Sequence, residues 1–228
     1  MNHQVFASSV VVVAAVLAVF YPYMRRGKPR VLALVLGVLA LLLSLVVGLP
    51  LQNTTRTLLE ETTIWQAIAI GIIAASTQES LKYVVVYKNT EQAEWIGYMF
   101  GLTSSLLVML VIATKSYALS YYSQTYLLLL GYKSFAITLF HTITATYMAI
   151  MIRVGYALRG LFITLLVHAL LDSYDTYLYI TNNIMSPSKT LILCIAIGLA
   201  LIILHKSIID IEAWEKTASQ LQEAGSEA

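Results

Sequence analysis

Seven long apolar segments, separated by short polar stretches, make up most of the chain. About 20 consecutive apolar residues are enough for an α-helix to cross the hydrocarbon core of a bilayer. The pattern therefore predicts an all-α integral membrane protein with about seven transmembrane helices. The segments lie near residues 4–23, 31–51, 64–87, 94–114, 133–152, 159–180 and 188–208.

These segments differ in polarity. The first two and the last consist almost entirely of Val, Leu, Ile and Ala, which is typical of lipid-facing helices. The third to sixth carry nearly all the intramembrane polar residues, so we expect them to form a polar bundle that holds the active site. We predict one transmembrane domain over 1–208, with a catalytic-like core at about 64–180. Residues 209–228 should form a cytoplasmic interfacial helix and tail.

Composition supports a membrane protein and excludes several other classes. Of the 228 residues, 59% are apolar and 11% are charged, whereas soluble domains contain roughly 25% charged residues. The formal net charge is +2, and the basic residues lie at segment ends rather than in one patch, so we expect no nucleic-acid partner. Cys194 is the only cysteine, which excludes an intrachain disulfide.

The distribution of Lys and Arg predicts the orientation, because these residues are enriched in cytoplasmic loops. Residues 1–20 contain neither, and the basic run over 25–30 follows the first segment. We therefore expect a cell-membrane protein with its N-terminus outside and its C-terminus in the cytoplasm. On this assignment the basic residues of the outer loops are Arg56, Lys115, Lys133 and Lys189.

Ionisable residues inside these segments are the candidate site. Glu79 lies in the third segment, His141 in the fifth, and His168 with Asp172 in the sixth. At 1.5 Å rise per residue, Glu79 and His168 both lie roughly 13 Å from the inner surface, and His141 about 18 Å from it. The spacing places Lys82 on the face of Glu79, and Asp172 one turn from His168. These groups should therefore meet at a similar depth. Tyr83, four residues after Glu79, is a supporting candidate on the same face.

This set of side chains suits two kinds of chemistry. A carboxylate in a cavity of low dielectric constant can act as a general base toward water, and nearby histidines can donate to a developing oxyanion. Alternatively, Glu79, His141 and His168 could bind a divalent metal such as zinc. The chain contains no HExxH motif, so the usual metalloprotease signature is absent. We expect either no cofactor or such a metal.

Three short motifs resemble those of the CAAX-protease superfamily of intramembrane proteases, especially its PrsW-like and YhfC-like branches. They are Gln78-Glu79-Ser80-Leu81-Lys82-Tyr83, Phe140-His141-Thr142-Ile143-Thr144 and His168-Ala169-Leu170-Leu171-Asp172. The resemblance covers roughly residues 64–180. It implies that Glu79 activates water, that His141 assists or stabilises the oxyanion, and that His168 with Asp172 completes the site. Lys82 would pair with Glu79. Gln78 stands where the family usually has the first of two adjacent acids.

Other interpretations of the same residues stay open. Glu79 with Lys82, and His168 with Asp172, could be purely structural pairs. A proton- or ion-coupled transporter or channel could use the same intramembrane charges. The amide at Gln78 is compatible with a catalytically inactive scaffold. The favoured function is an intramembrane peptidase acting on a membrane-embedded or membrane-adjacent peptide, which makes that peptide and the bilayer the expected partners. The sequence does not predict an oligomeric state.

Overall fold

The computed structural model describes residues 28–59, 63–114, 124–181 and 187–226, and every regular element in these ranges is helical. The elements are α2 (Val31–Leu58), α3 (Thr63–Tyr87), a short 3-10 helix η2 (Thr90–Gln92), α4 (Ala93–Thr114), α6 (Gln124–Arg153), α7 (Ala157–Ile180) and α8 (Pro187–Ser226). The predicted all-helical class is therefore confirmed.

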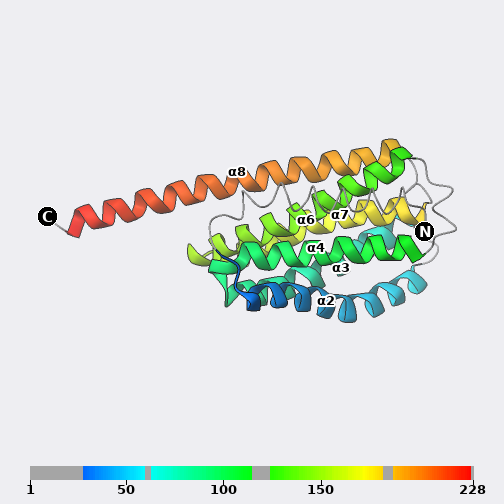
Figure 1. The fold of residues 1–228 in the computed structure, drawn as a ribbon, viewed down its shortest axis with the longest axis horizontal. Helices are drawn as coiled ribbons and strands as arrows, with labels where there is room; N and C mark the ends of the chain where they lie inside the picture. Colours follow the sequence, from blue (N-terminus) through cyan, green and yellow to red (C-terminus); the bar gives the residue numbers. More distant parts are fainter. Residues whose placement is uncertain (1–27, 60–62, 115–123, 182–186, 227–228) are drawn as a thin grey trace.

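The described helices form one elongated bundle (Figure 1). The most extensive contacts join α3 to α7 and α4 to α6, while α2 packs on α3 and α4, and α8 packs on α6. α8 runs along the bundle and then continues beyond the other helices toward the C-terminus (Figure 1). It passes through residue 209 without a break.

Four helical segments within the described ranges are long and apolar enough to cross a membrane. Predicted segments 64–87 and 94–114 are also helices, α3 and α4, but they are not among these four. Predicted segment 4–23 lies outside the described residues. The four segments are Val31–Leu58, Lys133–Arg153, Ala157–Ile180 and Leu191–Ala218.

Large apolar side chains are exposed on the outer faces of three of these helices. A contiguous apolar surface of this kind would be unfavourable in water and is the expected surface against lipid. The polar and charged side chains that are buried lie inside the bundle instead. These exposed apolar side chains and the four candidate spanning helices indicate an integral membrane protein. The exposed side chains include Leu39, Leu43 and Val46 on α2, Phe162, Leu166 and Leu170 on α7, and Ile195, Leu199 and Ile202 on α8.

Three positions assigned to outer loops from the sequence, Arg56, Lys133 and Lys189, lie in helices, so their assignment to loops was wrong. The fourth, Lys115, lies outside the described residues. α2 continues to Leu58 and includes Arg56 in its last turn. Within this part of the helix the hydroxyls of Thr54 and Thr55 donate to carbonyls one turn earlier, so these polar side chains are satisfied by the helix itself. Lys133 lies within α6, where it pairs with Asp175 of α7. Hydropathy alone marked the end of each apolar run, whereas the helices extend past it.

Small residues allow the helices around the site to approach closely, as in other membrane bundles. A Cβ at Gly101 of α4 would lie 2.7 Å from Thr138 Cα and 3.1 Å from His141 Cβ on α6. One turn earlier, a Cβ at Gly97 would overlap the His141 carbonyl, and a Cβ at Gly71 of α3 would overlap Ser173 of α7. The close approach at Gly101 and Gly97 brings α4 directly against the backbone that carries His141.

Candidate functional site

Glu79 and Lys82, one turn apart on α3, form a fully buried ion pair. Lys82 Nζ lies 2.7 Å from Glu79 Oε1, and neither side chain has any exposed surface. Both charges have lost their hydration, a penalty of several kcal/mol per ion that only close pairing and further hydrogen bonds can offset. The pairing expected from the i,i+3 spacing is therefore present. The further hydrogen-bond partners of these two side chains come from the neighbouring helices α6 and α7.

His168 of α7 links Glu79 to Asp172. Its Nδ1 atom is 2.6 Å from Glu79 Oε1, and its Nε2 atom is 3.3 Å from Asp172 Oδ2. Because both ring nitrogens face carboxylate oxygens, the doubly protonated imidazolium is the form that can donate to both. In that form Asp172, His168, Glu79 and Lys82 alternate in charge and sum to zero.

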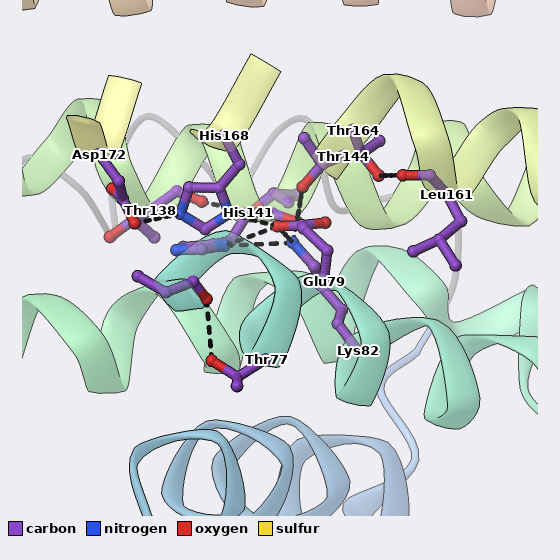
Figure 2. Close-up of polar contacts among 12 residues, drawn as sticks. Thr77, Glu79, Lys82, Thr138, His141, Thr144, Leu161, Thr164, His168 and Asp172 are labelled. Atoms are coloured by element: carbon purple, nitrogen blue, oxygen red, sulfur yellow. Dashed lines mark hydrogen bonds and ion pairs between the residues drawn. The ribbon is translucent and has the colours of Figure 1, made fainter. Parts of the chain in front are cut away.

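His141 of α6 completes the cluster from the other side of Lys82. Its Nδ1 atom is 3.2 Å from Lys82 Nζ and 4.0 Å from Glu79 Oε1. The ring packs against Phe100 of α4 at 4.7 Å between centroids and against the His168 ring at 5.2 Å. Figure 2 shows the two histidines and Lys82 converging on Glu79 from three helices. The predicted meeting of these side chains is thus found.

One oxygen of this cluster has no hydrogen-bond partner. Glu79 Oε1 accepts from both Lys82 and His168, whereas Glu79 Oε2 is buried and unpaired, the one such side-chain atom among the described residues. An unpaired buried acceptor costs roughly 1–3 kcal/mol, and more when it is charged. Such an atom is therefore a candidate acceptor for a ligand or for water.

A cavity of about 180 Å³ adjoins the cluster between α4, α6, α7 and α8. His141, His168 and Asp172 line it, whereas Glu79 and Lys82 do not. The two histidines therefore lie between the buried ion pair and the cavity. The Lys133–Asp175 pair also lines it, and the remaining wall is formed by Gln78, Ser104, Ser105, Val108, Ser134, Ile137, Phe140, Leu171, Leu193 and Ile197.

The remaining predicted residues differ in their placement. Gln78 is one of the residues that line the cavity. Tyr83 is directed elsewhere: it packs against the apolar cluster around Val86 and lies 5.7 Å from the Tyr87 ring. Among the described contacts, none joins Tyr83 to the Glu79 cluster.

Sequence reasoning missed two residues of this cluster. Thr144 Oγ1 accepts from Lys82 at 2.8 Å and donates to the His141 carbonyl at 3.2 Å. Its position three residues after His141 on one helix face was the available signal. Phe100, whose ring lies 5.3 Å from Lys82 Nζ, carried no signal in the sequence beyond its proximity to Gly101.

The chemistry open to this arrangement follows from its donors and acceptors. Glu79, His141 and His168 each offer one ligand atom, all within 4.8 Å of one another, so by distance alone they could hold a metal ion. The same three groups also offer a base, an N–H donor and an acid. No protein-family model matches the chain, and no curated protein matches it in sequence.

Proposed function

We propose that this protein is an intramembrane peptidase in which Glu79 activates water to hydrolyse a membrane-embedded or membrane-adjacent peptide bond. The observation that carries the proposal is Glu79 Oε2, a buried carboxylate oxygen without a partner beside two histidines that line a cavity. A structural ion pair needs no such free acceptor. A general base does, because it must accept a proton from water.

The roles of the other residues follow from their positions. Water attacks the peptide carbonyl carbon while its proton passes to Glu79. The carbonyl oxygen becomes an oxyanion and accepts a hydrogen bond from the His141 N–H that is not used by Lys82. His168, between Glu79 and Asp172, gives a proton to the departing amine as the carbon–nitrogen bond breaks. Asp172 holds the His168 ring in place for this transfer.

The cavity's size and lining favour a peptide segment over a free small molecule. Its 180 Å³ is below the roughly 300–1,000 Å³ of sites that enclose drug-sized ligands. Apolar side chains such as Phe140, Leu171 and Ile197 form part of its lining. One or two residues of a membrane-embedded substrate would fit while the rest of the chain stays in lipid.

The topology that goes with this function has about seven spans, an external N-terminus and a cytoplasmic C-terminus. In this proposal α3 and α4 cross the membrane together with the four candidate spanning helices. The polar side chains of α3, among them Gln66, Glu79 and Lys82, are buried within the bundle and so are shielded from lipid. The similarity of the three motifs to the PrsW-like and YhfC-like proteases supports the same assignment.

The test is cleavage of a panel of membrane-embedded peptides by the purified protein in lipid bilayers. Glu79→Gln should lower the rate by on the order of 10²–10⁴-fold, the usual contribution of a general base. Because this change leaves Lys82 without a counter-charge, the neutral double variant Glu79→Gln/Lys82→Met is tested beside it. Glu91→Gln, which alters an exposed acid in η2, is the matched control and should keep wild-type activity.

Full activity in a folded Glu79→Gln protein would overturn the proposal. Loss of peptide cleavage in both Glu79 variants, with cleavage retained in Glu91→Gln, would support the proposal. Cleavage should also survive a metal chelator, because no step in this mechanism passes through a metal.

One observation favours a second candidate, a proton-coupled transporter. Asp175, Asp172 and His168 follow one side of α7 along the cavity and lead to Glu79. Such a line of titratable groups could carry protons through a membrane protein. Proton flux in vesicles that Glu79→Gln abolishes, without cleavage of any peptide, would favour this function over the peptidase. If the protein neither cleaves peptides nor carries protons, an inactive scaffold would be favoured, which is consistent with the amide at Gln78.

A further inference from the structure

Three acceptors from two helices surround the Lys82 ammonium. Nζ lies 2.7 Å from Glu79 Oε1, 2.8 Å from Thr144 Oγ1 and 3.2 Å from His141 Nδ1. An ammonium group has three N–H donors and no acceptor. Thr144 uses its own proton on the His141 carbonyl, at 3.2 Å, so its oxygen is free to accept. Each donor of this fully buried cation therefore has one partner.

This arrangement determines which nitrogen of His141 carries the proton. Because an ammonium can only donate, His141 Nδ1 must accept from Lys82, and a neutral ring then carries its proton on Nε2. The ring is held by Phe100 at 4.7 Å between centroids, and its backbone is held by the two α4 glycines. His141 lines the cavity, so the N–H left over from the Lys82 contact is available to a ligand there.

The same cation competes with a metal for the cluster. Zinc binds carboxylate oxygen and imidazole nitrogen at about 2.0–2.2 Å. Glu79 Oε1 and His141 Nδ1 are 4.0 Å apart, so an ion bound to both would lie between them. Lys82 Nζ, which contacts both atoms, would then fall within the ion's coordination shell. An ammonium has no lone pair to coordinate with, and the two positive charges would repel each other.

We propose that Lys82 is a built-in cation that closes a latent divalent-metal site formed by Glu79, His141 and His168, and that it fixes His141 as an Nε2–H donor toward the cavity. Lys82 is thus a positioning residue. It supplies the positive charge beside Glu79 and orients His141. A metal bound at this site would have the same two roles. The inference rests on hydrogen-bond geometry and holds whether or not the protein is a peptidase.

The first experiment measures zinc bound to the full chain in lipid after incubation with zinc and removal of free ion. The wild type should retain almost none. Lys82→Met, similar in length and without charge, should retain about one zinc per chain, and zinc should raise its unfolding temperature. Lys82→Met/His141→Ala should lose that ion, and Lys82→Arg, which keeps the charge, should stay free of zinc. A wild type that binds one zinc, lost on His141→Ala, would overturn the proposal, as would a folded Lys82→Met that binds none.

A second measurement needs no variant at position 82 and therefore does not depend on whether Lys82→Met folds. Nitrogen-15 NMR of histidine-labelled wild type distinguishes the two neutral tautomers, and His141→Gln identifies the His141 signals by their loss. A protonated Nε2 with a bare, hydrogen-bonded Nδ1 is the expected result. A proton on Nδ1 would show that Lys82 does not donate to this ring and would overturn the proposal.

Discussion

Lys82 Nζ and Glu79 Oε1 are 2.7 Å apart, one turn from each other on α3, with both side chains fully buried. A pair in this setting differs from an ordinary surface salt bridge. Lys82 compensates part of the Glu79 charge, and Glu79 is the one carboxylate that contacts Lys82 among the described contacts. Loss of either partner therefore leaves buried charge that is less well compensated.

This relationship predicts a strongly non-additive double-mutant cycle. Glu79→Gln and Lys82→Met should each lower the free energy of unfolding by about 3–5 kcal/mol. The double variant should be more stable than the sum of the two predicts, because neither charge is then left alone. Unfolding of all three in detergent micelles, with the wild type as reference, measures the coupling.

The matched control is the pair of Arg30 and Glu91 at 3.5 Å, whose side chains are 71% and 79% exposed. The same cycle there should give a coupling below about 1 kcal/mol, because solvent screens exposed charges. Equal couplings at the two sites would contradict the assignment of the Glu79–Lys82 pair to a dry environment.

The α4 glycines provide a second prediction. A Cβ at Gly97 would overlap the His141 carbonyl, which is backbone and cannot rotate away. Gly97→Ala should therefore destabilise the protein by about 1–3 kcal/mol, the usual cost of overpacking, and should impair activity by moving His141. Gly198→Ala on α8 is the control, since a Cβ there meets nothing within 4 Å. It should be neutral or stabilising by up to about 1 kcal/mol. Thermal unfolding that ranks the two variants the other way would show that α4 does not contact His141 as described.

The sequence predicted those parts of the site that helix geometry determines. Residues three or four apart on one helix share a face, so the Glu79–Lys82 and His168–Asp172 contacts could be expected from their spacing alone. The similar depths of Glu79, His141 and His168 followed from the rise per residue. Both kinds of inference depend only on distances along a helix.

Contacts between helices could not be predicted in the same way. Which nitrogen of His141 faces Lys82, and whether Thr144 reaches that cation, depend on the rotation and separation of α3 and α6. Lys133, placed by the sequence at the outer end of segment 133–152, pairs with Asp175 on another helix. Its partner could be found only once α6 and α7 were packed together. The glycine contacts that set these separations are visible only in three dimensions.

Asp172 allows a test of the His168 arrangement that should leave the fold intact. Its side chain is 31% exposed at the cavity, and its Oδ2 atom lies 3.3 Å from His168 Nε2. Asp172→Asn keeps the shape but removes the charge that favours a protonated His168, so peptide cleavage should fall by on the order of 10²-fold. The unfolding free energy should change less than in the Glu79 variants. Asp210→Asn, an exposed position on α8, should not affect cleavage. Unchanged cleavage in Asp172→Asn would remove Asp172 from the mechanism.

Chemical labelling of single cysteines tests the cavity itself. In a Cys194→Ser background, Ser104→Cys would place a thiol on the cavity wall, and Thr144→Cys would place one at a fully buried position beside Lys82. A thiol reacts with a small water-soluble thiosulfonate only where the reagent and water reach it, so labelling at Ser104→Cys should be at least about 100-fold faster. A peptide that the protein cleaves should slow labelling at Ser104→Cys by occupying the cavity. Equal labelling rates at the two positions would mean that the reagent reaches the position of Thr144 beside Lys82 as easily as the cavity wall, and would contradict the burial of Thr144.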